Sequence, residues 1–385
     1  MNIVSSRQIY ERLIPHVDSG ELPGFCAVVS NNGHTVVASG GYSDLELKKT
    51  MDAESLFRLA SLTKPLTAVL TLQAVEMGDI TLDTELAELV PELANPRVLT
   101  NPRARFQTTL DSTGNPRYEV ETEALKRPIT VYDLLTMTSG YGFWVGTSLA
   151  AAYKTANINF GIQHHYSRAD FIRLIGQMPL CFQPGDGWAY NWSVEVLGVA
   201  LQRATGIPME TLMEERIRRP LGLKNLSYTM NSLAHATSMY KASPSGPVLL
   251  DPREGDYSRE PKYYSARTGL VTTAPEYLRI LDDLSSEDPI LLSPESAELM
   301  RTPALNEHQL KNKFFEPNAN FGMFVQVADG TGVLPEGSYG WSGISGVKAY
   351  SDPHTGTSFG LFTQMSTITT RPQPWFNDFW HLLFD

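Results

Sequence analysis

The sequence has little cysteine: only Cys26 and Cys181 occur among its 385 residues. Two thiols define neither a disulfide framework nor a zinc site. The eight histidines add no metal constellation, because His164 and His165 are neighbours rather than partners one helical turn apart and no His-Glu-x-x-His motif occurs. The sequence therefore predicts a protein without a metal, and we expect no cofactor.

Long apolar runs are also missing. No stretch reaches the about 18 residues that a membrane helix requires, and residues 1–8 lack the basic start, apolar run and small-residue cleavage site of a secretory signal. We therefore expect a soluble, cytoplasmic protein.

Positive charge is in deficit as well. The chain carries 31 Lys and Arg against 42 Asp and Glu, a formal charge of −11. A nucleic-acid or anionic-membrane partner requires a cationic surface, so the composition argues against both. A small neutral or cationic substrate is the partner that the charge favours, whereas the oligomeric state is not readable from the sequence.

The order of hydrophobic patterns predicts an α+β fold. Near the N-terminus a helical pattern at 7–18 is followed by β-rich runs at 25–30 and 35–38, joined at 31–33. The middle of the chain has mostly helical spacing, at 61–77, 131–137, 168–176, 193–204 and 208–217, and its segment 98–127 has the composition of surface loops. The last part predicts a helix at 275–284, strands at 322–327, 346–350 and 359–364, and a final helix at 375–383.

Strands at both ends with helices between them indicate one antiparallel sheet built from the two termini. We expect residues 1–60 and 240–385 to form this sheet with its flanking helices. Residues 61–239 are expected to form an inserted, mostly helical domain.

A Ser-x-x-Lys motif is the first candidate for chemistry. Three residues make about one helical turn, so a serine hydroxyl at a helix start lies beside a lysine at i+3. The motif occurs three times, at Ser61 and Lys64, at Ser238 and Lys241, and at Ser345 and Lys348. Only the first copy begins a long apolar helix; the second lies in a polar, loop-like region and the third in a strand-like run, where i and i+3 point to opposite faces.

A serine hydroxyl needs a base to become a nucleophile. Lys64 can serve as this base only if its pKa falls. Alternatively, its ammonium can hold a neighbouring group deprotonated, and a tyrosine phenol is such a group. Tyr190 is the candidate phenol, because it follows the turn at Pro184 and Gly185 and directly precedes a helical pattern. Taken singly, these residues leave open a capping serine with a snorkelling lysine and a packing tyrosine.

Five motifs together resemble those of the serine β-lactamase-like superfamily, which includes class C enzymes and penicillin-binding-protein-like members. They occur in the same order, over roughly residues 20–365: Ser61-Leu-Thr-Lys64, Leu134-Leu-Thr-Met-Thr-Ser-Gly140, Pro184-Gly-x-x-Trp-Ala-Tyr190, Arg219-Pro-Leu-Gly222 and Gly340-Trp-Ser-Gly343. The resemblance is closest to family VIII carboxylesterases and related acyltransferases. It implies a β-lactamase/transpeptidase-like fold with the active site in the cleft between the sheet and the helical domain.

The resemblance also implies roles for single residues. Ser61 matches the nucleophile, Lys64 its hydrogen-bonded activator, and Tyr190 the general base for acylation and the activator of water or alcohol for deacylation. The backbone amides of Ser61 and Ile344 correspond to the oxyanion hole.

Two departures from the family pattern bear on the substrate. Trp341-Ser342-Gly343 stands where many β-lactamases have Lys-Thr-Gly, so the cation that meets a β-lactam carboxylate is missing from that strand. Tyr190-Asn191-Trp192 stands where the penicillin-binding pattern has Tyr-x-Asn. We expect these five positions, 341–343, 191 and 192, to shape the substrate site. The changes resemble esterase and acyltransferase members, which implies a serine carboxylesterase acting on small or medium uncharged esters, with weak β-lactamase or acyl-transfer activity as side reactions.

Other classes remain as alternatives. A class C-like β-lactamase, a D-amino-acid peptidase or amidase, and an inactive binding protein all share the scaffold. A different hydrolase class is suggested by Gly356-Thr-Ser358-Phe-Gly360, which matches a Gly-x-Ser-x-Gly nucleophile elbow. That elbow requires a strand before it and a helix after it, whereas a turn precedes this copy and a β-like run follows, so we reject it.

Overall fold

A large antiparallel sheet organises the computed structural model, which describes residues 4–31, 33–158, 167–313, 315–367 and 372–385. Within them the sheet has eight strands in the order β12-β13-β14-β15-β16-β1-β2-β3, and neighbours pair antiparallel. Their bounds are β1 Gly24–Asn31, β2 His34–Asp44, β3 Lys49–Thr50, β12 Ala319–Phe321, β13 Gln326–Ala328, β14 Tyr339–Gly343, β15 Val347–Asp352 and β16 Thr357–Phe362. Strand β1 therefore pairs with β16 from the other end of the chain.

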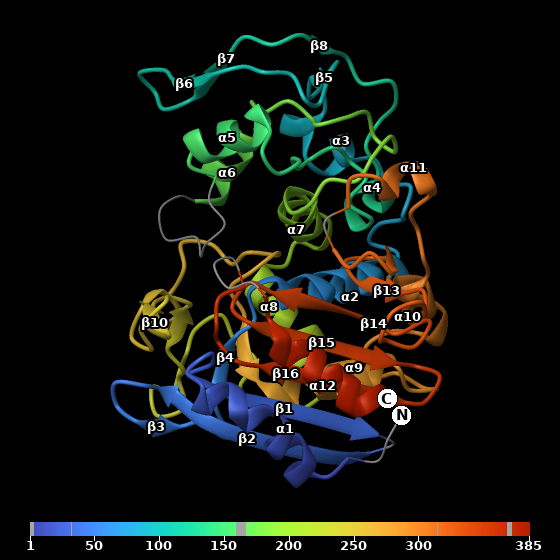
Figure 1. The fold of residues 1–385 in the computed structure, drawn as a ribbon. Helices are drawn as coiled ribbons and strands as arrows, with labels where there is room; N and C mark the ends of the chain where they lie inside the picture. The colour runs from blue at the N-terminus through green and yellow to red at the C-terminus, as the bar shows by residue number, and fades with distance from the viewer. Residues whose placement is uncertain (1–3, 32, 159–166, 314, 368–371) are drawn as a thin grey trace.

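Both faces of the sheet are buried. Successive side chains of a strand point to opposite faces, so Phe25 and Ala27 of β1 belong to one apolar cluster and Cys26 and Val28 to another. The first cluster includes the terminal helices α1 (Ser6–Asp18) and α12 (Pro374–Phe384), which contact each other on this face (Figure 1). The second includes α2 (Thr63–Glu76) and α9 (Ala274–Leu284). This double cover explains why β1 is an unbroken apolar run.

The helix-rich part lies above the sheet in Figure 1, around α2 and α7 (Trp192–Thr205). Helix α7 is buried from Trp192 to Leu201, which identifies it as a core helix. The other helices are α3 Leu86–Leu89, α4 Val131–Leu135, α5 Ser148–Thr155, α6 Arg168–Ile175, α8 Met209–Met213, α10 Pro294–Arg301 and α11 Glu307–Leu310, with short helical turns η1 Ala60–Leu62, η2 Pro91–Leu93, η3 Glu214–Arg218 and η4 Asp256–Ser258.

Short two-stranded ribbons complete the fold. They pair β4 (Leu56–Arg58) with β11 (Val271–Thr273), β5 (Val98–Leu99) with β8 (Thr122–Glu123), β6 (Thr108–Leu110) with β7 (Pro116–Tyr118), and β9 (Met239–Lys241) with β10 (Val248–Asp251). No helix among the described ranges is long and apolar enough to cross a membrane.

The predicted fold class is confirmed, because strands from both termini form one antiparallel sheet and the helices gather in the middle of the chain. The division at residues 60 and 240 stays a prediction. The expectation of loops alone over 98–127 is wrong, since β5 to β8 lie there. The single strand expected at 322–327 is also wrong: Phe324 adopts a left-handed φ of 58° and the Gly322 amide donates to the Val325 carbonyl, so a turn joins β12 to β13.

Both cysteines are buried and unpaired, and burial raises the pKa of each thiol to about 12, which makes them inert core residues. The neighbouring histidines 164 and 165 lie outside the described residues.

Candidate active site

Ser61 lies in the tight turn η1, between β4 and α2, and the residue is 8% exposed. The sequence analysis expected this serine inside the start of a helix, whereas the α-helix begins two residues later, at Thr63. The preceding residue, Ala60, has a left-handed φ of 47°. Such a backbone is costly for a residue with a Cβ and persists where the surroundings impose it, which is common at functional sites.

Lys64 lies one turn after Ser61 and is buried, with 1% of its surface exposed. Its Nζ donates to the Ser61 Oγ at 2.8 Å and to the Arg267 carbonyl oxygen at 3.0 Å. Burial lowers the pKa of the Lys64 ammonium well below its usual value; Arg267 adds to this lowering and Glu195 opposes it. The neutral amine, which accepts a proton, is thereby favoured beside the serine hydroxyl.

Tyr190 is the third group at this point. The Lys64 Nζ lies 4.9 Å from the centroid of its ring, and the Trp341 indole Nε1 donates to its hydroxyl at 3.1 Å. Burial raises the pKa of the Tyr190 phenol, and hydrogen bonds with Ser61 and Trp341 partly offset that rise. The structure thus brings together the three residues that the sequence singled out, although they are spread over 130 positions of the chain.

A buried ion pair that the sequence analysis missed lies behind Lys64. Arg267 and Glu195 are each 2% exposed at the side chain, with 3.3 Å between the Arg267 Nε and the Glu195 Oε2. The Ser265 hydroxyl also donates to this carboxylate, at 2.6 Å, and the guanidinium stacks over Trp192 at 4.5 Å. A glutamate inside the apolar run of α7 was the available signal, since a buried carboxylate requires a partner.

Strand β14 forms the opposite wall and approaches the serine turn closely. A Cβ added at Gly343 would lie 2.3 Å from the Leu59 carbonyl oxygen, which only a glycine avoids. This approach places Ile344, the residue after the strand, at the same cavity that Ser61 lines. Gly343 thus acts through backbone approach, whereas the sequence analysis grouped it with substrate contacts.

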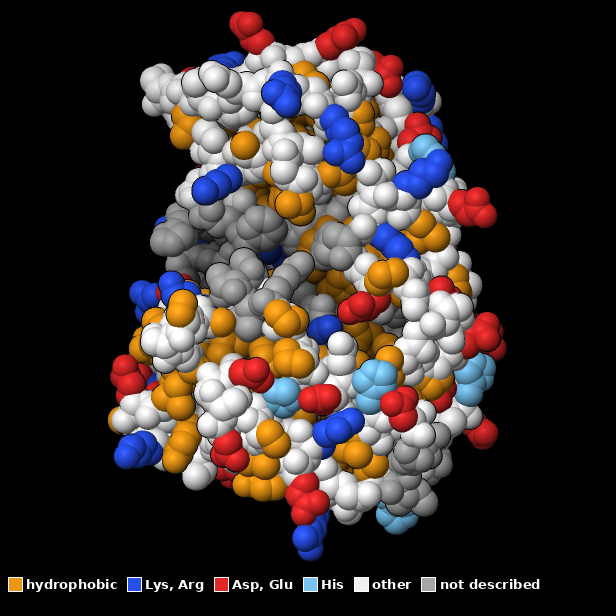
Figure 2. Space-filling model, in the orientation of Figure 1, with side chains coloured by type: hydrophobic (Ala, Val, Ile, Leu, Met, Phe, Trp, Pro, Cys, Tyr) orange, Lys and Arg blue, Asp and Glu red, His pale blue; other side chains and the backbone are white. Residues whose placement is uncertain are grey.

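A cavity of about 640 Å³ connects these groups. Ser61, Tyr190, Trp341, Ser342 and Ile344 line it together with residues of β15 and α12. In Figure 2 the surface is hollowed between the helix-rich part and the sheet below it. A volume of this size accommodates a small organic substrate.

Asn191 and Trp192 take other places than expected. Both are buried, at 2% and 0% exposure, and neither is among the described residues that line the cavity. Trp192 stacks on Tyr153 with 5.6 Å between ring centroids and belongs to the core. Asn191 has a φ of 101° and directly precedes α7. Trp192 thus packs in the core, and a direct contact of either residue with the substrate stays a prediction.

The other Ser-x-x-Lys copies have structural surroundings. Ser345 lies in the turn between β14 and β15, which corrects the strand-like assignment, and its hydroxyl donates to the Arg58 carbonyl. Ser238 is buried and donates to the Asp44 carboxylate. Ser358 is buried within β16, and the residues that directly follow it, up to Phe362, continue the same strand, so Ser358 does not lie at a strand-to-helix turn and the rejection of a nucleophile elbow is confirmed.

Residues 11–375 match the family model described as Beta-lactamase. Among curated proteins, an uncharacterised protein of Mycobacterium tuberculosis is 29% identical over 358 residues, which cover 87% of this chain and 84% of that protein. Esterase EstB of Burkholderia gladioli is 26% identical over 366 residues, covering 89% and 86%. The solved structure of EstCE1, a hydrolase with promiscuous acyltransferase activity, matches with a TM-score of 0.82 at 20% identity over 99% of this chain and 98% of that one.

Proposed function

The chain belongs to the β-lactamase family, and on that premise we propose that it is a serine carboxylesterase that forms an acyl-enzyme on Ser61. The observation that carries the proposal is the 2.8 Å hydrogen bond between a buried lysine, Lys64, and the Ser61 hydroxyl. A lysine in this position activates a serine only when its pKa is depressed, and burial depresses it here.

Acylation begins when the Ser61 oxygen attacks the ester carbonyl and its proton passes to the neutral amine of Lys64. The bond between the carbonyl carbon and the alcohol oxygen then breaks, and the departing oxygen receives that proton through the Tyr190 phenol. The family resemblance assigns the base role to Tyr190, but the opposite pKa directions of the two groups favour Lys64 as the first acceptor.

Deacylation reverses these proton transfers. A water molecule, or an alcohol in acyl transfer, gives its proton through the Tyr190 phenol to the amine of Lys64 and attacks the acyl carbon, and the Ser61 oxygen leaves with a proton returned from Lys64. The backbone amides of Ser61 and Ile344 are proposed to stabilise the oxyanion in both steps. Their residues line the same cavity, in support of this assignment.

Esters are favoured over β-lactams by the wall of the cavity. Trp341, buried beside Phe321 and Tyr190, occupies the strand position where many β-lactamases carry a lysine. An apolar indole there suits an ester alkyl or aryl group. The similarity to Esterase EstB, over most of both chains, points the same way.

The proposal is tested by measuring the hydrolysis of a para-nitrophenyl ester series, from acetate to decanoate. Cleavage of a chromogenic cephalosporin is measured in parallel under the same conditions. Wild-type protein is expected to hydrolyse the esters, with little cephalosporin cleavage, and Ser61→Ala to abolish turnover. Tyr190→Phe should reduce kcat/KM by about a hundredfold to ten-thousandfold, because it removes a proton-transfer group. Mass spectrometry of the quenched reaction should find the acyl group on the peptide that contains Ser61.

Ser358→Ala is the matched control. Ser358 is the serine of the Gly-x-Ser-x-Gly motif, which would be the nucleophile of the rejected hydrolase class, but it lies buried in β16. It should retain turnover. Ester hydrolysis that survives Ser61→Ala, or that disappears in Ser358→Ala while the protein stays folded, would contradict the proposal, and rapid cephalosporin cleavage would move the assignment to a β-lactamase.

A further inference from the structure

The active-site cavity continues past β14 to the helix α12, and we propose that Lys348 in this extension binds a carboxylate of the substrate, so that the preferred esters are anionic. The inference rests on the proposed function, since it names the substrate class of that same site. It concerns a residue of the third Ser-x-x-Lys copy, whose serine has a structural role.

Strand register brings Lys348 to the pocket. In the antiparallel pair of β14 and β15, Lys348 lies directly opposite Ser342. Side chains of such a pair lie on the same face of the sheet, with Cβ atoms about 4.5–5.5 Å apart. Both line the cavity that contains Ser61. The cation that the Trp-Ser-Gly motif lacks in its own strand is therefore supplied by the neighbouring strand.

A second cavity, of about 220 Å³, adjoins the first. The two share Glu316, Lys348, Tyr350 and Asn377 among their lining residues. Among the described residues that line either cavity, Lys348 and Glu316 are the charged ones. A substrate that reaches from Ser61 into this extension thus meets one cation and one anion among the lining residues that the structure describes.

The side chain of Lys348 is more buried than that of Glu316. Lys348 has a side-chain exposure of 18% and its Nζ lies 4.7 Å from the centroid of the Phe376 ring, whereas Glu316 is 57% exposed. The contact between their charged atoms is long, at 3.5 Å. Exposed ion pairs of this kind contribute little. An incoming carboxylate can therefore replace Glu316, which swings into solvent, while Lys348 keeps its place.

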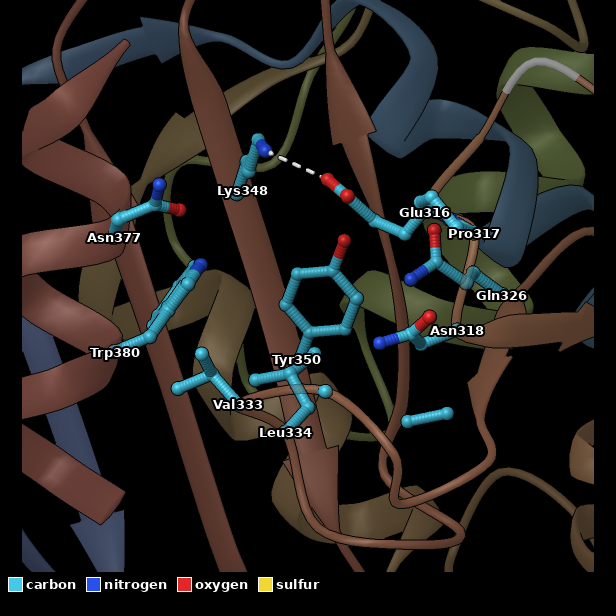
Figure 3. Close-up of a pocket in the computed structure, with 12 residues that line it drawn as sticks. Glu316, Pro317, Asn318, Gln326, Val333, Leu334, Lys348, Tyr350, Asn377 and Trp380 are labelled. Carbon is cyan, nitrogen blue, oxygen red and sulfur yellow. Dashed lines mark hydrogen bonds and ion pairs between the residues drawn. The ribbon is translucent and has the colours of Figure 1, made fainter. Parts of the chain in front are cut away.

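Further donors face the same space. Figure 3 shows the Tyr350 hydroxyl pointing toward the Lys348 and Glu316 pair, and the Asn377 amide on the other side of Lys348 from Glu316. Burial raises the pKa of the Tyr350 phenol, and Glu316 adds to that rise, so the phenol keeps its proton and can donate. An ammonium, a phenol and an amide suit the two oxygens of a carboxylate.

Chain-matched ester pairs test the inference. On the acyl side, the para-nitrophenyl monoesters of adipic and suberic acid are compared with para-nitrophenyl hexanoate and octanoate. On the alcohol side, para-acetoxybenzoate is compared with para-acetoxybenzamide. The readout is the ratio of kcat/KM for the anionic ester to that for its neutral partner, measured at low and high salt. We expect this ratio to exceed one in at least one pair and to fall with salt.

Two variants should move the ratio in opposite directions. Lys348→Met removes the cation and should lower the ratio about tenfold, chiefly through KM, because a hydrogen bond to a charged group is lost. Glu316→Gln removes the competing carboxylate and should raise it. Lys126→Met is the matched control, since it breaks a Lys–Glu contact of the same 3.5 Å with Glu123 outside both cavities.

The outcomes separate the two proposals. A ratio at or below one in every pair, or a ratio that Lys348→Met leaves unchanged while neutral esters are still hydrolysed through Ser61, overturns the carboxylate site and leaves the esterase proposal standing. Absence of Ser61-dependent turnover with any ester overturns the esterase proposal itself.

Discussion

Buried charge governs the chemistry at the scale of single residues. Lys64 has exchanged water for two hydrogen-bond acceptors, Ser61 Oγ and the Arg267 carbonyl, and for the face of the Tyr190 ring. These neutral partners do not replace the full hydration of an ammonium, so the neutral amine is favoured. The same burial favours the protonated form of the Tyr190 phenol. Two neighbouring groups with opposite pKa shifts suit the base and acid roles proposed for Lys64 and Tyr190.

The pH dependence of ester hydrolysis follows from the Lys64 shift. Burial disfavours the charged form and lowers the pKa, and in the proposed mechanism the active form is the neutral amine. Activity is therefore lost as pH falls through the lowered pKa, and the rising limb of kcat/KM should lie well below the usual lysine value of 10.5. Glu195→Gln removes a carboxylate that raises this pKa, so the limb should move to lower pH.

A pH–rate profile of both proteins checks this, with Glu92→Gln as the control. Glu92 pairs with Arg203 at 2.7 Å on the surface, so its loss should leave the limb in place. A limb unmoved in Glu195→Gln, or moved equally in Glu92→Gln, would show that the buried pair does not act on Lys64.

At the scale of elements, the site depends on the contact between β14 and the turn η1. The turn is held from the other side by β4, which pairs with β11, and by the Leu59 amide, which donates to the Leu270 carbonyl. Gly343 permits the approach of β14. The distance between the two elements sets where Ser61 and Ile344 lie relative to each other.

Gly343→Ala should therefore impair catalysis more than folding. The new Cβ would meet the Leu59 carbonyl and force the strand away from the turn, at a cost of about 1–3 kcal/mol. We expect kcat/KM to fall by at least about tenfold, with Tm lowered by a few degrees. Gly176→Ala, at the end of α6 where a Cβ meets its nearest neighbours at 3.1 Å, should keep its activity. Equal activity in both variants would show that this contact does not position the site.

At the scale of the whole molecule, one buried arginine joins segments that lie far apart in the sequence. Arg58, fully buried at the end of β4, donates to the Asp251 carboxylate at 2.9 Å, to the Thr237 carbonyl at 2.6 Å and to the Pro252 carbonyl at 2.9 Å. These partners are 179 to 194 positions away in the sequence. The strand that leads to Ser61 is thus fastened to the segment that follows the helix-rich part.

Arg58→Met should destabilise the protein by about 3–5 kcal/mol, since it removes a buried cation that donates to the Asp251 carboxylate and to the two carbonyls. Denaturant unfolding measures the change. The control variant Arg117→Met breaks a surface ion pair with Asp111, in which the Arg117 side chain is 69% exposed. It should lower the free energy of unfolding by less than about 1 kcal/mol. Similar losses in the two variants would contradict the role given to Arg58.

The sequence by itself determined the alternation of helix and strand patterns and the local pair Ser61 and Lys64, because a spacing of three residues acts within one turn of chain. The ordered motifs added Tyr190 and β14. Only the tertiary structure decided which groups surround them: the pair of Arg267 and Glu195, the core position of Trp192, and Lys348 with Asn377 in the extension of the cavity. Each depends on strand register or on packing between segments far apart in the chain, and neither is encoded in local spacing.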